Sequence, residues 1–253
     1  GDHAKALDRM RAAVNIDGSN ADAWANLGLL LTTIGHHRAA VEVYERAATI
    51  DPSPDILVNM AAAQLAWGQF VAAEATARRV VAADAVHAKA WFTLALALQP
   101  QGRMLEALDA VTRAASLAPT EEGFAGLKAQ IENGIGAPDK ARATLEKALT
   151  RLPMSRPLRF ELASLLEYKL GAPEAAAAQY AQILKLDPRY GPALSHLAFL
   201  RGRLADWQDR DALVRRYRDA VAAGASALSP FALLSLPSTR AEQRACARHW
   251  TAP

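Results

Sequence analysis

Residues 21–53 read ADAWANLGLLLTTIGHHRAAVEVYERAATIDPS, and this stretch decides the fold of the chain. Its central glycine belongs to a series spaced 34, 33, 34, 34 and 35 residues apart, namely Gly1, Gly35, Gly68, Gly102, Gly136 and Gly171. An alanine follows each of these glycines five positions later. A period this regular indicates an array of repeated structural units.

Each unit contains two helical patterns separated by the glycine. Before Gly35, apolar residues recur every three or four positions at Trp24, Leu27 and Leu31, the spacing of one helix face. After it, a second such pattern surrounds Tyr44, and Pro52 ends that pattern because proline inside a helix loses a hydrogen bond. The unit is therefore predicted to be helix–turn–helix, with the glycine at the turn.

The residue types in this unit resemble the tetratricopeptide repeat, whose signature spans 34 residues. The residues that match are Trp24, Leu27, Gly28, Gly35, Ala40, Tyr44, Ala47 and Pro52. The resemblance implies an all-α fold, a superhelical solenoid of helix–turn–helix repeats. We expect a non-repeat helical extension at the C-terminal end.

The repeat array is expected to occupy residues 1–203. We predict full repeats at 21–53, 54–87, 88–121, 122–156 and 157–190, flanked by partial repeats at 1–20 and 191–203. Because 1–20 matches only the second helix of a repeat, we expect this sequence to be a piece of a longer protein. The glycine–alanine–proline pattern does not continue after 203, so residues 204–253 are predicted to form a helical linker or cap.

Composition favours a protein that works neither in a membrane nor on nucleic acid. The sequence contains no apolar stretch of the ~20 residues that a membrane span requires. Its net charge is +3, but the arginines after 200 alternate with aspartates, which is typical of a solvated helix face. The single cysteine, Cys246, fits a reducing compartment and predicts a cytoplasmic location.

We expect no catalytic residue, cofactor site or metal site in this chain. Gly134 and Gly136 suggest a phosphate loop, but no strand precedes them and the third glycine is absent. His36 and His37 have no His or Cys partner at metal-ligand spacing. Cys246 has no assignable base, which favours a packed thiol over a nucleophile.

Residues 205–250 resemble the segment that joins the repeat arm to the glycosyltransferase region in bacterial O-linked N-acetylglucosamine transferases of the SPINDLY type. The resemblance depends on the pair Asp206-Trp207, a basic helix, the run SPFALLSLP at 229–237, and EQRACA at 242–247. The family usually has a cysteine where this chain has Ala205. The family's catalysis occurs in two nucleotide-binding lobes that hold a uridine diphosphate sugar, and this chain has no such lobes.

The candidate binding residues lie at the sixth position of each repeat, which faces the concave groove in the family resembled. There, asparagines grip the backbone of an extended peptide. In this chain the position yields four candidates for the groove, Asn26, Asn59, Thr93 and His196, while the other two repeats have leucine. An amide both donates and accepts hydrogen bonds, which suits a peptide bond. The alternative is that these are ordinary polar residues of the groove.

Two functions follow as hypotheses. The first is the repeat arm of a bacterial O-linked N-acetylglucosamine transferase, which recruits protein or extended peptide substrates without catalysing transfer itself. The second is a stand-alone scaffold or adaptor, whose C-terminal segment simply caps the array because a repeat array needs a polar end.

Overall fold

The computed structural model describes residues 2–206, 209–224, 227–234 and 236–251, and within these ranges all regular structure is helical. The predicted all-α, helix–turn–helix fold is confirmed. The helices are α1 (Asp2–Ile16), α2 (Ala21–Thr33), α3 (His37–Ile50), α4 (Pro54–Ala66), α5 (Phe70–Ala83), α6 (Ala88–Leu98), the 3-10 helix η1 (Gln99–Gln101), α7 (Met104–Leu117), α8 (Glu122–Gly134), α9 (Pro138–Arg151), α10 (Arg156–Tyr168), α11 (Pro173–Leu186), α12 (Gly191–Arg203), α13 (Arg210–Ala222), α14 (Pro230–Leu234) and α15 (Arg240–Thr251).

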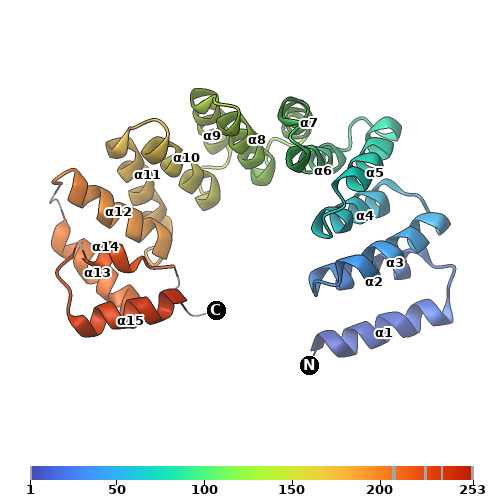
Figure 1. Ribbon diagram of the computed structural model, residues 1–253, viewed down its shortest axis with the longest axis horizontal. Helices are drawn as coiled ribbons and strands as arrows, with labels where there is room; N and C mark the ends of the chain where they lie inside the picture. Colours follow the sequence, from blue (N-terminus) through green and yellow to red (C-terminus); the bar gives the residue numbers. More distant parts are fainter. Residues whose placement is uncertain (1, 207–208, 225–226, 235, 252–253) are drawn as a thin grey trace. The chain divides into compact units, whose positions relative to one another are not determined.

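The chain divides into two compact units, unit 1 (residues 1–131) and unit 2 (residues 132–253). In unit 1 the pairs α2–α3, α4–α5 and α6–α7 pack together, and each pair contacts the next (Figure 1). The first helices α2, α4 and α6 also contact one another in sequence order. Unit 1 is therefore a row of helix pairs, with its first helices forming one layer.

A left-handed glycine ends the first helix of a pair. Gly35 has φ +85°, and its N–H donates to the carbonyl of Thr32 while the next N–H, of His36, donates to Leu31. This pair of hydrogen bonds is a Schellman motif, which favours glycine because other residues are strained at positive φ. Gly68, Gly102, Gly136 and Gly171 also have positive φ, so these glycines of the described residues lie at the turns that follow helices.

A close contact holds α2 against α3. A methyl group added at Gly28 would lie 2.8 Å from the Tyr44 ring, and that ring is fully buried. Glycine at this position lets the aromatic ring of the second helix approach the backbone of the first. Residues 28 and 44 therefore specify how the two helices of this pair pack.

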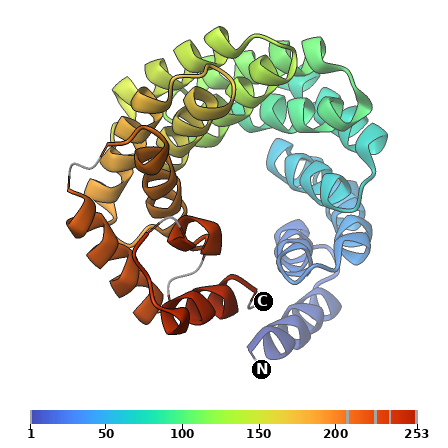
Figure 2. The same cartoon turned by 60° about the vertical axis from the view of Figure 1, so that its left-hand side comes forward.

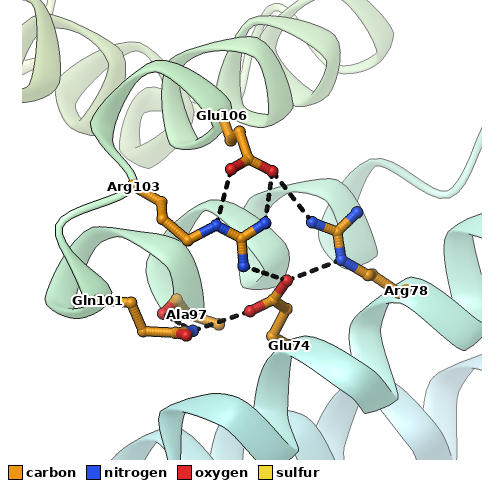
Figure 3. Close-up of polar contacts among 6 residues, drawn as sticks. All are labelled: Glu74, Arg78, Ala97, Gln101, Arg103 and Glu106. Atoms are coloured by element: carbon orange, nitrogen blue, oxygen red, sulfur yellow. Dashed lines mark hydrogen bonds and ion pairs between the residues drawn. The ribbon is translucent and has the colours of Figure 1, made fainter.

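A charged cluster joins α5 to the turn before α7, and we call it the Glu74 cluster (Figure 3). The Glu74 carboxylate accepts hydrogen bonds from Arg78 at 2.8 Å, Arg103 at 2.6 Å and Gln101 at 3.0 Å. Arg78 and Arg103 also pair with Glu106. Burial alone would raise the pKa of Glu74, but these hydrogen bonds outweigh it and lower that pKa. The cluster fixes α6 and α7 against the preceding pair.

In unit 2, α10 pairs with α11, α11 contacts α12, and α12 contacts both α13 and α14. The last helices, in orange to red, gather at the end of unit 2 (Figure 2), where α15 contacts α13 and α14. Tyr217 of α13 is fully buried, and its hydroxyl donates to the carbonyl of Ser229 at 2.6 Å. Ser229 N–H in turn donates to Ser195 Oγ at 2.9 Å. These bonds attach the start of α14 to α12 and α13.

Candidate functional site

Two of the predicted binding residues, Asn26 and Asn59, present their side chains at the surface of unit 1. They lie on α2 and α4, which contact each other, at the same position of consecutive repeats. Both are exposed. Neither lies at a helix end, because Asn20 is the N-cap of α2 and Ser53 is the N-cap of α4.

Each asparagine belongs to an exposed stripe along its helix. We call the two stripes together the first-helix face; its members are Asp22, Asn26, Leu29 and Thr33 on α2, and Asp55, Asn59, Ala62 and Ala66 on α4. On each helix a carboxylate precedes the amide by one turn. The face therefore offers two acidic groups, then two amides, then mainly small or apolar side chains.

The third predicted residue, Thr93 of α6, is buried rather than exposed. Its hydroxyl donates to the carbonyl of Lys89, one turn earlier in the same helix, at 2.8 Å. The adjacent Phe92 packs on Phe124 with ring centroids 4.6 Å apart. Thr93 thus presents little polar surface to a ligand, in contrast with the two asparagines.

The fourth predicted residue, His196 of α12, lies in unit 2 within a cluster of aromatic and acidic side chains. Its ring stacks on Tyr180 with centroids 4.9 Å apart, and Phe160 meets it edge-on at 5.6 Å. Its Nδ1 atom lies 3.0 Å from the carboxylate of Glu167, which also accepts a hydrogen bond from the Tyr180 hydroxyl at 3.0 Å. The side chain of Glu167 has no exposed area.

The Tyr180 hydroxyl is held as a donor by its surroundings. Burial raises its pKa, and the neighbouring Glu167 carboxylate adds to this increase, although a hydrogen bond with Ser164 opposes it. Tyr180 therefore stays protonated at neutral pH and donates to Glu167. The cluster holds the His196 ring in one orientation.

The other residues considered as possible sites, Cys246 and Gly136, have structural roles. Cys246 is buried, its thiol donates to the carbonyl of Leu228 at 3.4 Å, and burial raises the pKa of the thiol. Gly136 is a turn residue with φ +80°. In the described part of the chain no group of three or more His, Cys, Asp or Glu side chains could hold a metal ion.

Sequence reasoning missed the partner of His196 and the aromatic residues around it. Glu167 lies 29 residues earlier, on the preceding first helix. No motif in the sequence links the two, because their contact joins different positions of successive helices. The exposed aromatic side chains near His196, among them Tyr168 and Phe199, were also not singled out. Among the described residues, no helix is long and apolar enough to cross a membrane.

Comparison with known proteins identifies the repeats. Family models described as tetratricopeptide repeat match residues 21–54, 59–122 and 129–191, which together make up more than half of the chain. No curated protein sequence matches the chain.

Several solved structures are similar. A thermophilic TPR protein from Thermus thermophilus is 25% identical over 72% of this chain and 98% of its own, with a TM-score of 0.58. PilF of Pseudomonas aeruginosa is 21% identical over 80% of this chain and 92% of its own, with a TM-score of 0.64. A tetratricopeptide repeat protein from Parabacteroides merdae is 17% identical over 98% of this chain and 92% of its own, with a TM-score of 0.62. The last two likenesses concern the fold alone.

Proposed function

Because the chain belongs to the tetratricopeptide repeat family, we propose that it is a protein-binding scaffold that takes an extended protein segment along the first-helix face of unit 1. The observation that carries the proposal is the pair of exposed amides, Asn26 and Asn59, at equal positions on contacting helices. Each amide can donate to a backbone carbonyl and accept from a backbone N–H.

The spacing of the two amides suits an extended segment. Packed helices lie about 8–10 Å apart from axis to axis. An extended chain advances about 3.3 Å per residue, so this distance corresponds to about three residues. Asn26 and Asn59 can therefore grip two peptide groups of one segment, three residues apart, without reading its side chains.

The acidic residues of the first-helix face favour segments that carry positive charge. Asp22 and Asp55 each precede an amide by one turn, and both are exposed. Asp55 also lies 3.6 Å from Nε2 of His87. Exposed carboxylates of this kind attract basic side chains and mainly speed association. We therefore expect bound segments to carry lysine or arginine near the residues held by the amides.

The experiment pans a phage-displayed library of random dodecapeptides on the full chain and measures the Kd of the enriched, synthesised peptides by fluorescence anisotropy. The double variant Asn26→Ala/Asn59→Ala should weaken one class of peptides at least tenfold, about 1.4 kcal/mol. A net hydrogen bond contributes about 0.5–1.5 kcal/mol, so two lost amides account for this change.

The matched control is Asn15→Ala, an exposed asparagine on α1, outside the first-helix face. It should leave the Kd unchanged. N-methylation of the peptide backbone at sites three residues apart should abolish binding, because it removes the N–H donors. If no enriched peptide depends on Asn26 and Asn59, the proposal fails.

A second candidate function is the substrate-recruiting arm of a bacterial O-linked N-acetylglucosamine transferase. It is supported by the residue order of 205–250, although Trp207 of the Asp-Trp pair and Ser235 of the apolar run lie outside the described residues. Within that run, α14 buries Ala232 and Leu233 and exposes Phe231 and Leu234. In this hypothesis the arm presents protein substrates to a catalytic region beyond it, in the cytoplasm.

Reading the source gene past the codon for Pro253 separates the two candidates. Several hundred further residues with alternating strand and helix patterns would support the transferase arm, and a stop codon would leave the scaffold. Residues 1–253 alone should not transfer sugar from UDP-N-acetylglucosamine. Transfer by this chain would contradict both candidates. Fractionation of the source cells checks the cytoplasmic location.

A further inference from the structure

A pocket of about 290 Å³ opens in unit 2 where α10, α12, α14 and α15 meet, and its walls are aromatic. They include Tyr168, His196, Phe199, Phe231 and Trp250, and we call this the aromatic pocket. All of these except His196 are exposed large side chains, and Phe231 is 80% exposed. Exposed aromatic residues gathered around a hollow mark an interaction site, because soluble proteins otherwise cover such surface.

Contacts beneath the pocket hold His196 and the start of α14 in place. The His196 ring is fixed by Tyr180 and by Glu167, as described above. Phe231 follows closely on Ser229, whose N–H and carbonyl are tied to Ser195 and Tyr217. A preformed pocket loses little side-chain entropy on binding. The His196 ring and the backbone that carries Phe231 are therefore in place before a ligand binds.

The size of the pocket suits one side chain. Small-molecule sites usually span about 300–1,000 Å³. At about 290 Å³ this one lies just below that range. Its aromatic walls favour a bulky apolar group over a polar one. A large apolar side chain that projects from a partner protein fits these walls.

The positive charge of Arg203, beside the pocket, indicates which charge a ligand should carry next to its apolar side chain. The guanidinium of Arg203 lies 5.6 Å from the centroid of the Phe199 ring. Burial raises the pKa of Tyr168 and Glu167 adds to this increase, while the nearby positive charge of Arg203 opposes it. Among the described residues Arg203 has no acidic partner, whereas the nearby Arg201 pairs with Asp206. The Glu167 carboxylate is buried behind His196 and does not line the pocket.

We propose that the aromatic pocket binds a protein segment in which a bulky apolar side chain adjoins an acidic residue, with the side chain in the pocket and the acid paired to Arg203. This is a second binding surface, in the other unit from Asn26 and Asn59. Its preference for acidic segments is opposite to that of the first-helix face.

The test uses the same random dodecapeptide library panned on the full chain. We expect a class of peptides that share Phe, Trp, Leu or Met next to Asp or Glu. For a synthesised member of this class, Phe231→Ala and Trp250→Ala should each raise the Kd at least tenfold. Both residues are exposed, so neither change should disturb folding.

The charge pairing is tested by reversal. Arg203→Glu should weaken the acidic peptide at least fivefold, and replacing the peptide's acid by lysine should restore binding to that variant. Arg79→Glu, an exposed arginine of α5, and Leu105→Ala, an exposed leucine of α7, are the matched controls and should leave the Kd unchanged. Asn26→Ala/Asn59→Ala should also leave it unchanged, so this site and the first-helix face succeed or fail separately.

Three results would overturn the proposal. One is the absence of any enriched peptide whose Kd depends on Phe231. Another is enrichment of basic peptides that need Phe231, which would make the pocket a cation site. The third is concentration-dependent dimerisation of the wild-type chain that Phe231→Ala abolishes, measured by sedimentation, which would make a second copy the occupant.

Discussion

Gly28 is a residue at which the packing of α2 on α3 tolerates little change. An added methyl group would lie 2.8 Å from the Tyr44 ring, which is 1% exposed. Overpacking of this kind costs about 1–3 kcal/mol. We predict that Gly28→Ala lowers the free energy of unfolding by that amount, measured from the midpoint of urea denaturation.

The control for this prediction is Gly202→Ala, in the last turn of α12, where an added methyl group meets nothing within 4 Å. Alanine is favoured over glycine within a helix by about 0.5–1 kcal/mol. Gly202→Ala should therefore leave stability unchanged or raise it slightly. Equal losses at both glycines would show that Tyr44 is not the cause.

The proposed binding residues show what the sequence can and cannot predict at this scale. The repeat period was enough to place Asn26 and Asn59 at equal positions of two first helices. It also placed Thr93 there, but the exposure of that position depends on its neighbours. In the third pair Thr93 is buried and bonds to its own helix. A sequence period specifies the position of a residue, not how its neighbours cover it.

At the scale of elements, the Glu74 cluster is expected to make stability depend on pH. The pKa of Glu74 is lowered in the folded protein, so its carboxylate stabilises the fold. This stabilisation is fully present above the ordinary carboxyl pKa of about 4.3 and is lost as the pH falls below that value. We predict that Glu74→Gln lowers the free energy of unfolding by about 1–3 kcal/mol at pH 7. The difference in the free energy of unfolding between the variant and wild type should shrink below about pH 4. Urea denaturation at a series of pH values measures this difference.

Glu42→Gln is the matched control, because Glu42 pairs with Arg38 one turn earlier on the same helix and both side chains are exposed. Such a pair contributes only about 0.3–0.5 kcal/mol. A difference between wild type and Glu74→Gln that stays constant from pH 7 to pH 3 would contradict the assigned role of the Glu74 carboxylate.

The short helix α14 should respond unequally to two neighbouring substitutions. Leu233 is 1% exposed, whereas Leu234 is 62% exposed. Deleting a buried leucine side chain costs about 2–5 kcal/mol, while a surface change usually stays within about 0.5 kcal/mol. We predict that Leu233→Ala lowers the melting temperature and Leu234→Ala does not. Similar melting temperatures for both variants would contradict the burial of Leu233 in α14.

At the scale of the molecule, the 34-residue period predicted the helix pairs and their turns, because each repeat contacts mainly its neighbours. It did not predict the contacts of the C-terminal segment. There the connection between α13 and α14 is longer than the turns of the array, and buried Tyr217 bonds to Ser229 across it. The aromatic pocket arises from four helices that are not all repeat elements, so no period indicates it. The repeat boundaries and the linker at 204–253 stay predictions.

The most direct measurement of the central claim locates a bound segment on unit 1. A peptide whose binding depends on Asn26 and Asn59 is spin-labelled and added to the full chain, and the loss of backbone amide NMR signals is recorded. We predict signal loss in α2 and α4, which carry the first-helix face, and little change in α3 and α5. Signal loss confined to α3 and α5, or to unit 2, would contradict the assignment of the binding surface.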